Sequence, residues 1–233
     1  MRVLVTRPEP GASRTAVRLV AAGHEAVVLP LTATIGVPVK GANLPAADAI
    51  AITSANALRF APRALLPTLT QKPLFAVGGK TAEAAQAAGF ASVTEGKGDA
   101  GALAGLIAAR LPAGASVLYL CGRVRRPDFE AALNQAGFAV NPVETYDVSR
   151  IGYPDADVRA AVGSNGADAV LLYSAVAAEA YGELAVRSGD LFGPARVLCL
   201  SRRIAGAVGA GVRMEIRVAA APDEESLFAL LEA

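Results

Sequence analysis

The sequence predicts an α/β fold built on parallel sheets, and three observations lead to that prediction. Short β-branched apolar runs alternate with Ala-rich stretches of helical character, the second half of the chain repeats the first, and 233 residues suit one large or two small domains. Strands alternating with helices of about 10–15 residues are typical of parallel sheets covered on both faces. Right-handed crossovers then bring every strand-to-helix turn to one edge, where such sheets bind ligands.

The first half shows the alternation most clearly. Each strand candidate is short and rich in Val, Ile, Leu and Ala, and helix candidates end at glycines such as Gly23 and Gly89. The predicted strands cover residues 3–6, 25–31, 48–53, 74–77 and 91–95, and the predicted helices cover 12–22, 55–65, 80–88 and a segment carrying Leu103, Leu106, Ile107 and Leu111.

Matching residues recur along the chain in the same order. Val3-Leu4 corresponds to Val117-Leu118, and Leu19 to Leu133. The segment ADAIAITSA resembles ADAVLLYSA, which aligns Ser54 with Ser174. Later pairs are Ala82 with Ala205 and Leu103 with Leu227, and the offset grows slowly. These ordered blocks predict a duplicated α/β unit, with a cleft where the turn edges face one another.

Composition excludes several classes of protein. A hydrophobic fraction of 53% is too high for a disordered chain. A formal charge of +1 lacks the basic surface of a general nucleic-acid binder. The apolar segments fall short of the roughly 20 residues that span a bilayer, and the N-terminal segment does not resemble a signal peptide. We therefore expect a cytoplasmic protein without nucleic-acid or membrane partners.

Two nucleotide-binding motifs fail on inspection. The stretch GGKT at 78–81 would need a glycine at position 74 to complete a phosphate-binding loop, but that residue is Leu74. No G-x-G-x-x-G sequence opens a helix, so a dinucleotide site is not expected.

The metal and thiol candidates are weak as well. The chain has one histidine, His24, and two cysteines, Cys121 and Cys199, without zinc-site spacing. Cys121 follows a predicted strand beside several arginines that would lower a thiol pKa. No histidine base lies nearby in the sequence, so a small residue at a tight turn is the favoured interpretation. No metal and no cofactor are expected.

The predicted turns carry a common chemistry. Glycine and small hydroxyl residues at helix starts expose backbone N–H groups that attract anions, although Ser, Thr and Asn also cap helices. Several such turns together would hold a polyanion on a protein of low net charge. The candidate binding residues are Arg7, Ser54, Asn56, Gly79, Lys80, Gly122, Arg123, Ser174, Ala175, Ser201, Arg202 and Arg203.

The residues also resemble a known family, uroporphyrinogen-III synthase of tetrapyrrole biosynthesis. The resemblance covers nearly the whole chain. It is carried by VLVTRPEPGASRTAVRLVAAGHEAVVLPL, AIAITSANALR, FAVGGKTAEAAQAAGF, VLYLCGRVRRPDFEAALNQAGFAVNPVETYDV and AVLLYSAVAAEAY.

The resemblance implies two similar doubly wound, flavodoxin-like domains joined by a two-stranded connector, with the ligand cleft between them. One domain would combine residues 1–36 with 150–233, and the other would hold 37–149. The segments LPLTATIGVPV and VETYDVSRIGY would be the crossings.

The implied reaction converts hydroxymethylbilane to uroporphyrinogen III, with loss of water and inversion of ring D. It needs no cofactor, and the resemblance favours a monomer. The acetate and propionate carboxylates of hydroxymethylbilane would bind to turn amides and arginines.

The resemblance also implies roles for particular residues. Tyr146 matches a cleft tyrosine whose phenol would assist the departing hydroxyl, or it simply packs at the connector. Ser54 and Ser174 match turn serines that contact substrate. The stretch Ser201-Arg202-Arg203-Ile204 departs from the family's common Gly-Pro-Thr-Thr, so a threonine contact is missing, and Arg203 is a candidate replacement.

Two further hypotheses stay open at this stage. One is a two-domain binding module that closes on a small anion, although many such modules are exported and this chain shows no export signal. The other is a degenerate synthase retained as an interaction domain.

Overall fold

The computed structural model describes residues 1–39, 44–192 and 194–232. The chain divides into two compact units, which we describe separately. The first unit contains Met1–Ala33 and Ser149–Ala233, and the second contains Thr34–Val148. Within the described residues, no helix has the length and apolar character needed to cross a membrane.

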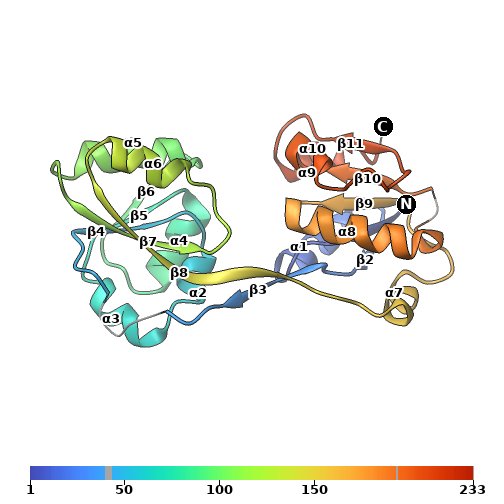
Figure 1. The fold of residues 1–233 in the computed structure, drawn as a ribbon, viewed down its shortest axis with the longest axis horizontal. Helices are drawn as coiled ribbons and strands as arrows, with labels where there is room; N and C mark the ends of the chain where they lie inside the picture. Colours follow the sequence, from blue (N-terminus) through green and yellow to red (C-terminus); the bar gives the residue numbers. More distant parts are fainter. Residues whose placement is uncertain (40–43, 193, 233) are drawn as a thin grey trace. The chain divides into compact units, whose positions relative to one another are not determined.

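The first unit is a five-stranded sheet in the order β2-β1-β9-β10-β11, and every neighbouring pair is parallel. Helices cover both faces (Figure 1): α7, α8 and α9 pack on one face, and α1 and α10 on the other. Its elements are β1 (Arg2–Val5), α1 (Gly11–Ala21), β2 (Glu25–Val28), α7 (Asp155–Val162), β9 (Ala169–Leu172), α8 (Ala175–Arg187), the short 3-10 turn Gly189–Leu191, β10 (Arg196–Cys199), α9 (Arg202–Gly206), β11 (Ile216–Val218) and α10 (Glu224–Phe228).

The second unit has a six-stranded sheet in the order β3-β8-β7-β4-β5-β6. The strands from β8 to β6 pair in parallel. Helices α5 and α6 cover one face, and α2, α3 and α4 cover the other. Its elements are β3 (Thr32–Gly36), β4 (Ala49–Ile52), α2 (Asn56–Arg59), a 3-10 turn (Arg63–Leu65), α3 (Leu66–Leu69), β5 (Leu74–Ala76), α4 (Gly79–Ala87), β6 (Val93–Glu95), α5 (Ala100–Arg110), β7 (Ser116–Gly122), α6 (Asp128–Gln135) and β8 (Ala139–Arg150).

The two sheets repeat one topology, as the sequence repeat predicts. The order β2-β1-β9-β10-β11 becomes β8-β7-β4-β5-β6 when each strand is replaced by its counterpart. The matched sequence pairs fall on counterpart elements: Leu19 and Leu133 lie in α1 and α6, and Leu103 and Leu227 in α5 and α10. The sheets are therefore of the doubly wound α/β class, with β1 and β7 as equivalent strands.

Strands β3 and β8 carry the chain between the two units. The Val37 amide donates to the Thr145 carbonyl at 3.0 Å, and the Ile151 amide donates to the Leu31 carbonyl at 2.9 Å. Since one member of each pair advances along the chain while the other recedes, the two segments run antiparallel.

The prediction of one helix is wrong. A continuous helix over residues 55–65 is replaced by α2, a 3-10 turn and α3. Pro62 has an extended backbone, with ψ of 126°. Proline lacks the N–H that a helix interior needs and disfavours the helical conformation in the residue before it, so α2 ends at Arg59.

Both cysteines are core residues of central strands. Cys121 and Cys199 are 2% and 0% exposed, and burial raises the pKa of each thiol to about 12. The positive charge of Arg125 opposes this rise in the pKa of Cys121 but does not cancel it. A thiol that holds its proton at neutral pH is a poor nucleophile. Cys121 is therefore a packing residue, but it lies inside strand β7 and not at the tight turn that the sequence predicted.

A glycine decides how closely α8 approaches the turn after α9. A Cβ on Gly182 would lie 2.0 Å from the Val208 carbonyl oxygen, a backbone atom that cannot move without shifting α9. We predict that Gly182→Ala destabilises the protein by about 1–3 kcal/mol, the usual cost of overpacking. Gly105→Ala is the matched control, because nothing lies within 4 Å of its Cβ position in α5. It should gain about 0.5–1 kcal/mol from helix propensity. Urea unfolding midpoints measure both, and a Gly182→Ala protein as stable as wild type contradicts the prediction.

Candidate functional site

Each sheet has one point where the chain changes direction. In the second unit, β7 connects to β8 on one side and β4 connects to β5 on the other, so the switch point lies between β7 and β4. In the first unit the equivalent point lies between β1 and β9. Doubly wound sheets bind ligands at the carboxyl ends of the strands flanking such a point. The turns after β4, β7, β1 and β9 are therefore the first places to look.

Tyr146 reaches the switch point of the second unit through a β-bulge. Cys121 pairs with Glu144, whereas Gly122 pairs with Tyr146, so Thr145 is an extra residue in β8. The buried Thr145 hydroxyl donates to the Ala57 carbonyl at 2.9 Å. A bulge redirects the following side chain, and here Tyr146 packs on the face covered by α2 and α4.

Gly122 makes room for the Tyr146 ring. A Cβ on Gly122 would lie 2.7 Å from two ring carbons of Tyr146 and 3.0 Å from its hydroxyl oxygen. Any other residue at this position would push the ring away. The structure thus gives Gly122 a supporting contact with Tyr146, in addition to its expected role in substrate binding.

The Tyr146 phenol is a neutral hydrogen-bond donor. Burial raises its pKa above the ordinary value, and the neighbouring Ser54 hydroxyl lowers it in part. The Ser54 hydroxyl oxygen accepts a hydrogen bond from the backbone N–H of Asn56 at 3.2 Å. Tyr146, Ser54, Asn56 and Gly122 are therefore brought together at one edge of the second sheet.

Sequence reasoning missed a second tyrosine at the same edge. The Tyr119 hydroxyl lies 2.7 Å from the Thr53 hydroxyl, and Tyr119 is 2% exposed. This bond ties the turn that carries Ser54 to the neighbouring strand β7. No local sequence pattern indicates this contact, because Tyr119 lies within the apolar strand β7, 66 positions from Thr53.

The arginines after β7 are paired with carboxylates of their own unit. Arg123 bonds Glu144 at 3.2 Å and Asp147 at 3.1 Å, while Arg125 bonds Glu130 at 2.6 Å and Glu144 at 3.0 Å. Hydrogen bonds from Arg123 and then Arg125 hold the pKa of Glu144 below its usual range. The charge of Arg123 is thus compensated, and a substrate carboxylate would have to compete with Glu144 and Asp147.

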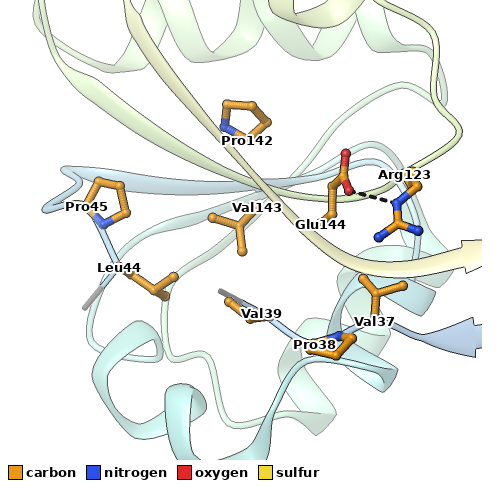
Figure 2. A pocket seen from close by; sticks show the side chains of 9 residues that line it. All are labelled: Val37, Pro38, Val39, Leu44, Pro45, Arg123, Pro142, Val143 and Glu144. Atoms are coloured by element: carbon orange, nitrogen blue, oxygen red, sulfur yellow. Dashed lines mark hydrogen bonds and ion pairs between the residues drawn. The ribbon is translucent and has the colours of Figure 1, made fainter. Parts of the chain in front are cut away.

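A pocket of about 500 Å³ lies beside Arg123 (Figure 2). Most of its lining residues are apolar, and the Arg123–Glu144 ion pair supplies its charged groups. Arg123 is the sole candidate binding residue that lines it, and Tyr146 and Ser54 are not part of its wall. We therefore place the candidate site at the switch point rather than in this pocket, whose lining residues are Val37, Pro38, Val39, Leu44, Pro45, Arg123, Pro142, Val143 and Glu144.

Gly79 and Lys80 lie one strand further along, where α4 begins. The residue before the helix, Gly78, is extended and provides no side-chain cap. Lys80 is exposed. A Cβ on Gly79 would lie 3.2 Å from a carboxylate oxygen of Glu95, so an acidic side chain of the protein already lies near this helix start.

In the first unit, two of the expected serines act as helix caps. The Ser174 oxygen accepts from the Ala177 amide at 3.2 Å, and the Ser201 oxygen accepts from the Ile204 amide at 3.4 Å. Ala175 is the first residue of α8. Capping uses an oxygen lone pair, and the hydroxyl proton can still be donated to a carboxylate.

The remaining expected residues differ in how firmly they are held. Arg202 and Arg203 are exposed in the first turn of α9. Arg7 lies under the start of α1 and bonds Thr15 and Glu224, both at 3.3 Å. The first unit therefore combines two exposed arginines with one constrained arginine.

Comparisons with known proteins agree on one family. The model of the family described as uroporphyrinogen-III synthase HemD matches residues 13–229. The chain resembles the crystal structure of uroporphyrinogen-III synthetase from Helicobacter pylori, with a TM-score of 0.67, 18% identity, and coverage of 100% of this chain and 99% of that one. It also resembles a mutant uroporphyrinogen III synthase from Thermus thermophilus, with a TM-score of 0.55, 19% identity, and coverage of 100% and 96%.

At these identities the two structural likenesses show a shared α/β fold. No curated protein matches the chain. The match to the family model, by contrast, extends over most of the sequence and includes the candidate site of the second unit. The chain therefore belongs to the uroporphyrinogen-III synthase family, whose members are cyclising hydro-lyases of tetrapyrrole biosynthesis.

Proposed function

We propose that this chain closes the linear tetrapyrrole hydroxymethylbilane to uroporphyrinogen III, with loss of water and inversion of ring D. The observation that carries the proposal is the partly buried, neutral Tyr146 phenol, which packs against Gly122 beside the turn that carries Ser54. These residues meet at the switch point of a doubly wound sheet, inside the region that matches the family model.

Tyr146 is the proposed catalytic residue. As the bond from carbon to the hydroxyl breaks, the pyrrole nitrogen lone pair supplies electrons and an azafulvene cation forms. The phenol proton goes to the departing hydroxyl, which leaves as water. Attack through the substituted carbon of ring D gives a spiro intermediate. The bond from this carbon to the bridge to ring C then breaks, and the bridge carbon bonds to the free carbon of ring D instead. The proton released when the pyrrole regains aromaticity then returns to Tyr146, so atoms and charge balance.

Control of shape is the main task of the site. Unassisted closure gives the uninverted isomer, and each 1.4 kcal/mol of preference changes the isomer ratio about tenfold. A rigid turn is suited to this task. The Ser54 hydroxyl oxygen accepts from the Asn56 backbone amide, and the hydroxyl of the adjacent Thr53 is bonded to Tyr119.

The substrate carboxylates would be received by turn hydroxyls, amides and cations of both units. In the second unit these are Ser54, Asn56, Gly79, Lys80, Gly122 and Arg123. In the first unit they are Arg7, Ser174, Ala175, Ser201, Arg202 and Arg203, with Arg203 in place of the threonine that the family pattern would supply. The exposure of Lys80, Arg202 and Arg203 supports this assignment.

We further propose that residues 1–36 with 150–233 and residues 37–149 act as two domains on one substrate, held in a cleft that both contribute to. The protein would work as a cytoplasmic monomer without a cofactor, a nucleic acid or a membrane. Parallel sheets of matching strand order in the two units support the two-domain arrangement.

Freshly prepared hydroxymethylbilane tests the function directly. Incubation with the protein should yield mainly the type III isomer, separated from type I by chromatography of the oxidised porphyrins. Type I alone, at the rate seen without protein, contradicts the proposal. Tight binding of the bilane without turnover would then favour a binding module or a degenerate synthase.

Replacement of the phenol tests the role of Tyr146. We expect Tyr146→Phe to lower kcat by roughly 10²-fold or more, the usual range for loss of a positioned acid, while the melting temperature stays close to that of wild type. Tyr153→Phe is the control, because it removes a phenol hydroxyl of the first unit that donates to the Pro30 carbonyl of the same unit. Wild-type kcat in Tyr146→Phe would reduce Tyr146 to a packing residue.

Displacement of the ring tests the contact with Gly122. We expect Gly122→Ala to lower kcat, because the new methyl group would occupy the space of two Tyr146 ring carbons. In a Tyr146→Ala background the same substitution should cause no further loss. Gly105→Ala, in the same unit, serves as the control. Additive losses from Gly122→Ala and Tyr146→Ala would mean that Gly122 acts independently of the tyrosine.

A further inference from the structure

A partly buried carboxylate lies at the switch point of the first unit. Glu224, the first residue of α10, has a side chain that is 18% exposed. Its Oε1 atom accepts from the Thr15 hydroxyl at 2.6 Å, the Tyr173 hydroxyl at 2.7 Å and Arg7 Nη1 at 3.3 Å. Its other oxygen accepts from Arg18.

These donors come from two stretches that are distant in the sequence. Arg7 follows β1, Tyr173 follows β9, and Thr15 and Arg18 lie on α1. Glu224 lies in α10, which follows the edge strand β11 in the sequence. Leu227 of the same short helix is fully buried and holds the helix against the sheet. One carboxylate thus joins the two turns that flank the switch point.

The hydrogen bonds keep this carboxylate ionised. Burial alone would raise the pKa of Glu224, but the bonds from Thr15, Tyr173 and Arg18 outweigh burial and hold the pKa below its ordinary value. A fixed negative charge is what a guanidinium needs as an anchor.

Arg7 is the residue that this arrangement immobilises. Its guanidinium lies over the Tyr173 ring, 4.4 Å from the ring centre. A Cβ on Gly11 would lie 2.6 Å from Arg7 Nε, so the glycine opens the space that the side chain fills. The bonds to Thr15 and Glu224 both use Nη1, and the side chain is still 30% exposed. Nη2 therefore retains donors suited to a carboxylate from solution.

We infer that Glu224 is a positioning residue, which holds Arg7 at the switch point of the first unit so that Arg7 receives a substrate carboxylate. This inference rests on the proposed function, since it assigns a polycarboxylate ligand to that site. Its physical basis is preorganisation: an arginine already fixed loses less rotational freedom when a ligand binds.

Removal of one charge tests the inference. Glu224→Gln keeps the size of the side chain and should raise the KM for hydroxymethylbilane about threefold to tenfold, with kcat changed less than twofold. The Kd of uroporphyrin III, the oxidised form of the proposed product, should rise by a similar factor. Glu225→Gln is the matched control, because Glu225 is the next residue, also reaches Arg18, at 3.6 Å, and is 87% exposed. It should leave KM and Kd unchanged.

A double-mutant cycle separates positioning from general stability. In an Arg7→Ala background, Glu224→Gln should raise KM and Kd no further. Unchanged KM and Kd in Glu224→Gln, or effects that add to those of Arg7→Ala, would overturn the inference and leave Glu224 a stabilising residue. If Glu224→Gln does not fold, Glu224→Asp keeps the charge on a shorter arm and should give a smaller rise in both constants; wild-type constants there would equally overturn it.

The wild-type assay keeps this outcome apart from the proposed function. Absence of type III product from wild type contradicts the function, and the uroporphyrin Kd then still decides whether Glu224 positions Arg7. Wild-type turnover with an insensitive Glu224→Gln variant contradicts the inference alone.

Discussion

Parallel strand pairing, with both faces of each sheet buried, is the constraint on which the rest of this structure depends. Because parallel strands need crossover helices, the turns that leave the strands collect at the carboxyl edge of each sheet. In each unit the chain crosses from one central strand toward one edge of the sheet and from its neighbour toward the other edge. The switch point therefore lies beside β1 in the first unit and beside β7 in the second. Tyr146 with Ser54 in one unit, and Arg7 with Glu224 in the other, lie at these points.

The chain balances its charges locally, and this shapes how it meets an anionic ligand. Arg123 and Arg125 face Glu144, and Arg7 and Arg18 face Glu224. Partly exposed ion pairs contribute little stability by themselves, so their value lies in fixing the direction of the side chains. In each unit, arginines are therefore oriented by internal carboxylates, whereas Lys80 and Arg203 are exposed.

Much of the fold was predictable, and the failures have local causes. The alternation of apolar strands and Ala-rich helices, and the pairing of Leu19 with Leu133, anticipated the repeated α/β topology. The helix over 55–65 was wrong because Pro62 breaks the backbone hydrogen bonding there. The placement of Ser, Gly and Arg residues at the carboxyl ends of strands was predictable, because such residues follow the apolar runs in the sequence. Thr53, Tyr119 and Glu224 were missed, because nothing in their neighbours signals a polar contact.

By itself, the sequence determined the order of the elements, the apolar character of both sheets and the kinds of residue that occupy the turns. These are local properties, set by side-chain periodicity and by glycine and proline within a few positions. Only the tertiary structure decided that Thr145 is the extra residue of a bulge, that Tyr146 lies on Gly122, and that Glu224 binds Arg7 from 217 positions away. Such contacts depend on strand register and on how helices cross the sheet, which local sequence patterns do not specify.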